Sequence, residues 1–250
     1  MKFALPTAGI LAFFLSTNIA QARLLDLSFQ RITTNNTENI ADQLSAKVYD
    51  KAQALTDFSS TSTENLTAIN AMTSDKVLFT FSNSAEVTSS IGEIYFDDGT
   101  IFKQTTILNS LSGDTDFSDG GKNGINPGDL PGGNTISPIF QKTADFGADT
   151  QGNLNNGVNT INDILGIVIQ LFSDVDFDGL QDSLVNGDLR LGLRVKSIGS
   201  ADGSDSFINN PFGAGGPATI ATPIPAAMWL FGPALLGLAG TIRRKSTKTV

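Results

Sequence analysis

The amino-acid sequence predicts a mainly β protein, an antiparallel β-sandwich with long polar loops, that carries an apolar segment at each end of the chain. Apolar and polar residues alternate with a period of two along residues 189–195 and 77–81, which is typical of strands. Stretches rich in glycine, aspartate and asparagine separate the strand signals. The 250 residues suffice for one domain with a substantial core. We therefore expect the sandwich at residues 23–210.

The composition excludes several kinds of chemistry. Histidine and cysteine are absent, which excludes Ser-His-Asp triads, cysteine nucleophiles, His/Cys zinc sites and disulfides. The chain has 16 Lys and Arg against 25 Asp and Glu, a net charge of −9. An acidic chain without a basic stripe predicts that no nucleic acid is bound.

Residues 1–22 have the features of a secretory signal peptide. Lys2 provides a positive start, and a mostly apolar run follows it. Ala20 and Ala22 place small side chains where a signal peptidase requires them, so the mature chain is expected to begin at Arg23. A membrane anchor and a buried helix are the alternatives, but the run is too short to span a bilayer comfortably.

The body contains further strand signals. Residues 165–171 are continuously apolar, which indicates a strand buried on both faces. Asp98 and Gly99 form a dipeptide preferred in two-residue turns, so residues 94–102 are expected to form a β-hairpin. Residues 40–48 fit the period of either a helix or a strand.

Two stretches of the body are rich in glycine. Residues 112–134 are expected to form a long surface loop or a pair of loops. The second stretch, residues 199–216, contains Phe207 and Ile208 as a candidate last strand. It then continues into a Gly/Pro/Ala spacer at residues 211–221.

One acidic segment matches part of a calcium-binding loop. Four carboxylates stand at positions 1, 3, 5 and 9 of such a loop, and glycine stands at position 6; these are Asp174, Asp176, Asp178, Asp182 and Gly179. Position 12, which should supply a bidentate glutamate, is Val185.

The alternative for this segment is a short helix. Asp176 or Asp178 would cap it, and Gly187 would end it. Its apolar side chains would face the core; they are Phe177, Leu180, Leu184 and Val185. We favour the helix over bound Ca²⁺, because the twelfth ligand is missing.

Carboxylates elsewhere are weak candidates for a glycosidase. Asp97 and Asp98 are adjacent, and adjacent strand residues point to opposite faces. Asp114, Asp116 and Asp119 lie in a glycine-rich segment without an apolar wall. We therefore expect no enzymatic activity and no resident cofactor, with an extracellular hydrolase as the least favoured alternative.

The C-terminal part of the chain predicts a membrane-spanning helix. Residues 224–242 carry no charge, and 19 residues of helix measure roughly 28 Å, enough for the hydrocarbon core. Trp229 is expected at the membrane interface. A basic cluster at residues 243–245 follows as a stop-transfer signal, and residues 246–250 form the tail; the cluster consists of Arg243, Arg244 and Lys245.

The charge distribution predicts the orientation of this helix. All 25 acidic residues lie between Asp26 and Asp205, and none follows the apolar segment. The positive-inside rule leaves the basic tail in the cytoplasm and the body outside. The body between Arg23 and Ala221 holds 11 of the basic residues, so its net charge is −14.

Residues 222–245 resemble a PEP-CTERM sorting signal of bacterial surface proteins, in its VPLPA variant. Three ordered elements carry the resemblance: a short proline motif, the stretch WLFG at residues 229–232 and the stretch LLGL at residues 235–238. The motif consists of Thr222, Pro223, Ile224, Pro225 and Ala226. It departs from the family pattern at Thr222, where valine is usual, and at Ile224, where leucine is usual.

This resemblance implies an exosortase as a partner, a membrane-embedded cysteine protease or transpeptidase that cuts in or near residues 222–226. Pro223 and Pro225 favour an extended backbone, which a protease needs. The alternative is a single-pass anchor that is never cut.

The body is similar to ectodomains that are often joined to this sorting signal. The shared segments are the strand signal at residues 77–81, IYFDDG at 94–99, LPGGN at 130–134, a DLRLGLRV-type strand at 188–195 and SFINNP at 206–211. The resemblance implies no activity.

The sequence thus predicts a non-enzymatic structural or adhesive protein. We expect it to pass from a membrane intermediate to the surface or the biofilm and exopolysaccharide matrix of a Gram-negative bacterium. Negative charge could bridge to anionic polysaccharide through divalent cations. A calcium-dependent carbohydrate- or matrix-binding module is the alternative.

Overall fold

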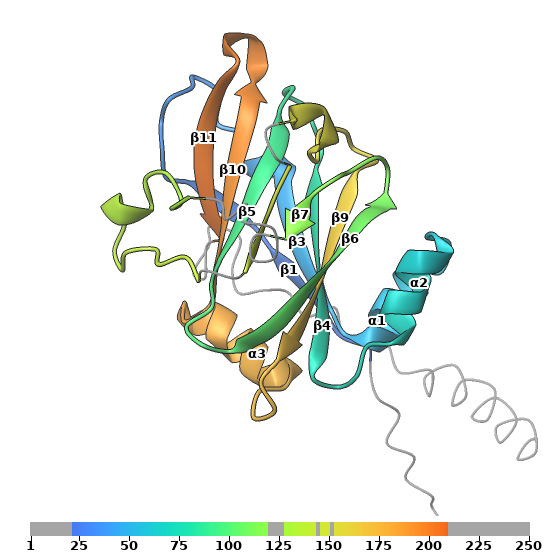
Figure 1. Ribbon diagram of the computed structural model, residues 1–250. Helices are drawn as coiled ribbons and strands as arrows, with labels where there is room; N and C mark the ends of the chain where they lie inside the picture. Colours follow the sequence, from blue (N-terminus) through green and yellow to red (C-terminus); the bar gives the residue numbers. More distant parts are fainter. Residues whose placement is uncertain (1–21, 120–127, 144–145, 151–152, 210–250) are drawn as a thin grey trace, which may run out of the picture.

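The computed structural model describes residues 22–119, 128–143, 146–150 and 153–209. These residues form two antiparallel sheets that pack face to face as a β-sandwich (Figure 1). The first sheet has the strand order β1-β3-β4-β9-β6; its strands are β1 Leu24–Leu27, β3 Leu44–Tyr49, β4 Lys76–Asn83, β9 Ile164–Leu171 and β6 Phe102–Ser112. The second has the order β2-β11-β10-β5-β8-β7; its strands are β2 Phe29–Arg31, β11 Gly203–Asn209, β10 Arg190–Ile198, β5 Ser90–Asp97, β8 Gly147–Asp149 and β7 Ser118–Asp119.

The main core lies between the two sheets and is rich in phenylalanine. Phe79 of β4 contacts Phe96 of β5 edge to face, with ring centroids 5.5 Å apart. Phe102 of β6 packs against Phe96 in the same manner at 5.3 Å. Such edge-to-face pairs favour aromatic rings beyond the burial of their area. These contacts join both sheets through fully buried side chains.

Two helices cover the outer face of the first sheet. They are α1 Lys51–Asp57 and α2 Thr63–Asn70. Phe58 at the end of α1 packs on Tyr49 of β3 at 5.3 Å, and Ile69 of α2 is fully buried over Leu78 of β4. This second core explains why β9 is buried on both faces, since its Val168 points toward the helices.

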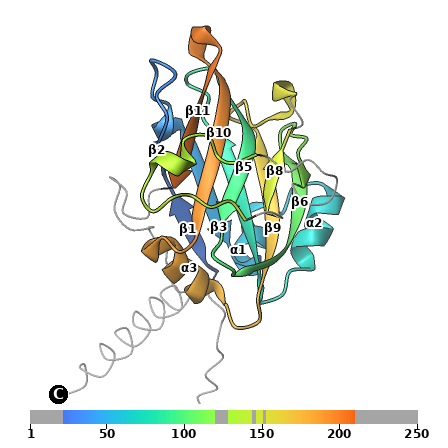
Figure 2. The same cartoon turned by 60° about the vertical axis from the view of Figure 1, so that its left-hand side comes forward.

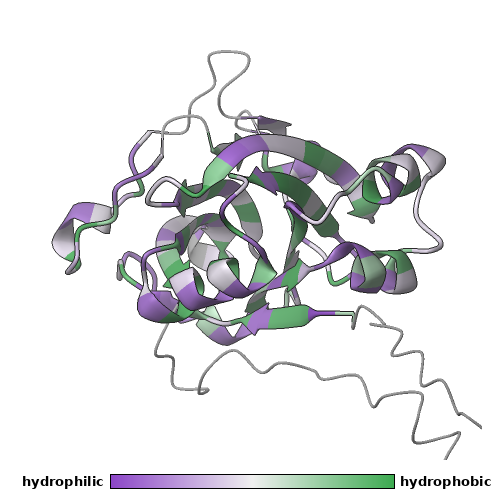
Figure 3. Ribbon diagram, turned by 90° about the horizontal axis from the view of Figure 1, so that it is seen from below, coloured by the Kyte–Doolittle hydropathy of each residue, from purple (hydrophilic) through white to green (hydrophobic). Residues whose placement is uncertain are grey.

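The third helix, α3 Phe177–Asn186, lies across one end of the sandwich (Figures 1 and 2). Its buried side chains Phe177, Leu180 and Leu184 join the core between the sheets. Four short 3-10 helices occur in the described connections; they are Ala41–Gln43, Gly133–Thr135, Leu154–Asn156 and Gly199–Ala201. In Figure 3 long hydrophobic stretches mark the strands, whereas the helices alternate in hydropathy.

Most strand predictions are confirmed. The alternating segments are β4 and β10, the continuous apolar run is β9, and Phe207 with Ile208 lies in β11. The ambiguous residues 40–48 contain β3, in which Ala46 and Val48 face the main core. Residues 44–48 therefore follow the strand period and not the helix period, because β3 pairs with β1 on one side and with β4 on the other.

The predicted hairpin at residues 94–102 is wrong. Gly99 makes the expected turn with φ +63°, but β5 pairs with β10 and β8, whereas β6 pairs with β9. The turn therefore carries the chain from one sheet to the other. Asp98 is buried beneath it and accepts a 2.8 Å hydrogen bond from the backbone N–H of Phe102, which fixes this crossing.

The predicted solvent-exposed face of β10 is also wrong over half of the strand. Arg190 and Gly192 are buried, because residues 128–143 lie over them. The described part of the predicted surface loop thus packs on the second sheet through Leu130, which is 3% exposed. A short strand, β7, lies in the same region of the sequence.

Candidate functional site

The residues predicted to direct processing lie almost entirely outside the described residues. This holds for Ala20, for the motif at residues 222–226, for Trp229 and for the basic cluster at 243–245. Ala22, the second residue of the predicted cleavage site, is half-buried two residues before the start of β1. Among the described helices, none has the length and apolarity that crossing a bilayer requires.

The acidic segment at residues 174–185 forms a capped helix. Asp176 is the N-cap of α3, where its carboxylate accepts a 2.9 Å hydrogen bond from the backbone N–H of Gly179. Gly187 follows the helix with φ +81°, as an αL cap requires. Asp178 pairs with Arg23 at 2.8 Å, and Asp174 and Asp182 are exposed. Within the described residues no three carboxylates cluster as a metal site would need.

The aspartates considered for hydrolysis make separate structural contacts. Asp97 points to the outer face of the second sheet and pairs with Arg190, whereas the neighbouring Asp98 points inward. The Asp116 carboxylate accepts a long hydrogen bond of 3.5 Å from the side-chain amide of Asn109, and the Asp119 carboxylate accepts one of 3.3 Å from the Thr105 hydroxyl. The backbone N–H of Asp114 bonds to Asp163.

The outer face of the second sheet carries a small separate core, which we call the covered face. It consists of buried Tyr95, Leu130, Phe140 and Ile208 with half-buried Ile32 and Ile136. Gly192 lies at its centre, where a Cβ atom would stand 2.7 Å from Leu130 Cδ2 and 3.1 Å from Phe140 Cζ. Glycine is therefore required for residues 128–143 to approach β10 this closely.

Arg190 anchors the edge of the covered face. Its guanidinium pairs with Asp97 and donates 2.6 Å hydrogen bonds to the backbone carbonyls of Pro138 and Ile139. It also lies 5.4 Å from the ring centroid of Phe140, a cation–π contact. One buried cation thus satisfies a carboxylate, two carbonyls and an aromatic face.

A second charged cluster lies further along β5 and β10. Glu93 is 6% exposed and bonds to Lys196 at 2.5 Å, to Arg194 at 3.5 Å and to the hydroxyl of Tyr95. Burial alone would raise the pKa of Glu93, but the hydrogen bonds and the two cations lower it below its usual value. Burial and the neighbouring Glu93 raise the pKa of Tyr95 far above its usual range.

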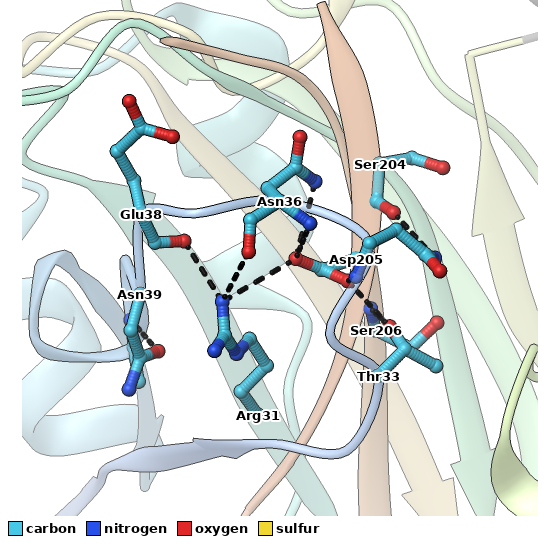
Figure 4. A network of polar contacts seen from close by, with 10 residues as sticks. Arg31, Thr33, Asn36, Glu38, Asn39, Ser204, Asp205 and Ser206 are labelled. Atoms are coloured by element: carbon cyan, nitrogen blue, oxygen red, sulfur yellow. Dashed lines mark hydrogen bonds and ion pairs between the residues drawn. The ribbon is translucent and has the colours of Figure 1, made fainter. Parts of the chain in front are cut away.

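A third network surrounds Asp205 at the end of the sandwich opposite α3 (Figure 4). The carboxylate is 1% exposed. It accepts hydrogen bonds from the Thr33 hydroxyl, the backbone of Asn35 and both the backbone and the amide of Asn36. Arg31 lies 3.6 Å from it and also bonds to the carbonyls of Asn36 and Glu38. These contacts hold the connection between β2 and β3 in place.

An open pocket of about 600 Å³ lies between α1, the beginning of β4 and α3. Apolar side chains form its floor, among them Met72, Val77 and Phe177. Charged groups surround it; they are Arg23, Asp50, Lys51, Lys76 and Asp176. The sequence did not predict this site, because its residues come from four separate segments of the chain. The one signal that could have pointed to it was the position of Arg23 directly after the predicted cleavage site.

The comparisons with known proteins add no family. No protein-family model matches the chain, and no curated protein or solved structure matches it significantly. The class that the structure defines is therefore an antiparallel two-sheet β-sandwich.

Proposed function

We propose that this chain is an exported protein of a Gram-negative cell surface or extracellular matrix, processed at its C-terminus by an exosortase. Its β-sandwich body has a structural or adhesive role and no enzymatic one. The observation that carries the proposal is the sequence of residues 222–245, in which the proline motif, the apolar segment and the basic cluster follow one another in the order of a sorting signal.

The geometry of the body supports attachment through its C-terminal end. The last described strand, β11, ends at Asn209, next to the expected spacer. The side chain of Asn209 accepts a 2.7 Å hydrogen bond from the backbone N–H of Leu191, so the strand end is fixed to the start of β10. A body released or tethered beyond this point keeps every strand of the two described sheets.

The polar contacts support a non-enzymatic role. The most deeply buried carboxylates of the described residues, those of Glu93, Asp98, Asp163 and Asp205, all accept structural hydrogen bonds.

Intact mass spectrometry of the protein recovered from outside its native cells tests the proposal. We expect a species that begins at Arg23 and ends in or near residues 222–226, and any excess mass identifies what is attached to the new end. A species that retains residues 243–250 would contradict the proposal and leave a membrane-anchored β-sandwich.

Two variants sharpen this test. Replacing both prolines of the motif, Pro223→Ala with Pro225→Ala, should cause the basic cluster to be retained, because the extended backbone is lost. Thr222→Val is the matched control, since it restores the residue that is usual in the family, and it should be processed at least as completely as the wild type.

A further inference from the structure

Arg23, at the rim of the pocket, contacts two segments, Asp50 and α3, through three different groups. Its backbone nitrogen donates a 2.9 Å hydrogen bond to Asp50 Oδ2, and its carbonyl accepts one of 3.1 Å from the backbone of Asp50. Its guanidinium bonds to both carboxylate oxygens of Asp178 in α3, at 2.8 and 3.2 Å, and lies 5.5 Å from the ring centroid of Phe177.

Asp50 is shared between two partners. Its Oδ1 atom caps α1 by accepting a 2.8 Å hydrogen bond from the backbone N–H of Gln53, while Oδ2 accepts from Arg23. The carboxylate is thus held by the start of a helix with its second oxygen directed at the nitrogen of one particular residue. That residue is the expected first residue of the mature chain.

We propose that Asp50 is a binding site for the new N-terminus, and that signal-peptide removal after Ala22 completes the fold through an ion pair between the Arg23 α-ammonium and Asp50. The inference rests on the signal-peptidase site of the proposed function. Hydrolysis consumes one water: the Ala22–Arg23 C–N bond breaks, hydroxyl joins the Ala22 carbonyl carbon, and a proton joins the Arg23 nitrogen. Below its pKa the new amine takes up a further proton from solvent, so a neutral peptide N–H becomes a cation.

The surroundings favour this cation. The open pocket leaves room for water to accept the ammonium hydrogens that Asp50 does not. Two lysines oppose the new charge, but Lys51 directs its ammonium to the carbonyl of Asn70 at 2.6 Å. The charged groups around Arg23 are the cations of Lys51 and Lys76 and the carboxylates of Asp50, Asp176 and Asp178. The uncut chain has the same hydrogen bond without the charge, so it is the less stable form.

The test uses residues 23–250, purified in mild detergent with Arg23 as the first residue, and the same protein selectively acetylated at its α-amino group. Acetylation restores a neutral amide N–H. At pH 7 the free form should melt about 2–4 °C higher, as measured by circular dichroism. The difference between the two forms should shrink as the pH rises through the titration of the α-amino group, whose ordinary pKa is about 7.7–8.0, because the neutral amine no longer pairs with the Asp50 carboxylate.

Asp50→Asn should abolish the difference between the free and acetylated forms while keeping the helix cap, because asparagine is also a good N-cap. Asp176→Asn, which changes the equivalent cap of α3, is the control and should preserve the difference. The proposal is overturned if the two forms of the wild type melt alike at pH 7, or if the difference survives in Asp50→Asn. Both N-termini are prepared in vitro, so a native mass that begins elsewhere would refute the processing site without altering this result.

Discussion

The substitution Arg190→Met should weaken the packing of residues 128–143 on the second sheet. Methionine retains an apolar stem over Phe140, but it leaves Asp97 without its cation and the carbonyls of Pro138 and Ile139 without their donor. The two charged side chains are only 9% and 13% exposed. Removing one partner of a buried ion pair costs about 3–5 kcal/mol.

The structure places the expected cost at the lower end of that range. Asp97 keeps a 2.9 Å hydrogen bond from the backbone N–H of Gln141, so its charge is not entirely uncompensated. We expect Arg190→Met to lower the free energy of unfolding by about 3 kcal/mol. For a domain of this size the melting temperature should fall by about 6–12 °C.

Urea denaturation followed by circular dichroism measures this change. The double variant Asp97→Asn with Arg190→Met should recover at least about 1 kcal/mol, because no buried charge remains. Arg194→Met is the control on the same strand: its side chain is 36% exposed and Glu93 keeps Lys196, so we expect a loss below about 1 kcal/mol. The reasoning is refuted if Arg190→Met is as stable as the control, or if the double variant is the least stable protein.

Four further predictions concern titration, helix capping and calcium. The folded pKa of Glu93 is lowered, so its stabilisation is present above about pH 4.5 and is lost as the pH falls through the folded value; Glu93→Gln should lose less stability on acidification, measured by urea denaturation at each pH. Tyr49 and Tyr95 are the only tyrosines of the chain, and burial raises the pKa of Tyr49 to about 12 and that of Tyr95 further. Absorbance at 295 nm should therefore show no phenolate at pH 10 in the folded protein. Ionisation at pH 10 without unfolding would contradict the burial of these two side chains. Asp176→Ala should lower the free energy of unfolding by about 1 kcal/mol, because the N-cap of α3 is lost. Millimolar Ca²⁺ should leave the melting temperature of the wild type unchanged. A rise in melting temperature that Asp176→Asn with Asp178→Asn abolishes would instead support the calcium-binding alternative.

The predictions that were confirmed depend on local signals. The strand signals of β4 and β9 lie within the strands themselves: Val77, Phe79 and Phe81 of β4 face the main core, and β9 is continuously apolar because both of its faces are buried. In α3 the cap at Asp176 and the glycine at 187 lie within one short segment, so the helix could be recognised without knowing its neighbours. Local chemistry was sufficient wherever one element carried the whole pattern.

The predictions that were wrong depend on partners distant in sequence. An Asp-Gly turn such as that at residues 98–99 can close a hairpin or carry the chain from one sheet to the other, and the local sequence is the same in both cases. Only the pairing of β5 with β10 decides between the two. Gly192 was interpreted as part of a solvated face because nothing near it in the sequence indicates that Leu130 covers it. The contact between Arg23 and Asp50 spans 27 residues and was missed for the same reason.

The covered face also bears on where a specific function should be sought. Four of the five segments on which the predicted resemblance of the body rests contribute to it or to its edge through their described residues, 94–99, 130–134, 188–195 and 206–209, whereas residues 77–81 lie in β4 of the other sheet. One packing requirement therefore accounts for these four segments: a glycine-floored sheet face, a segment that covers it and the buried arginine that holds the segment. None of these groups needs a ligand to explain its position. Any binding that is particular to this protein should then depend on surfaces outside the covered face, such as the pocket beside Arg23 and the loops at the end opposite α3.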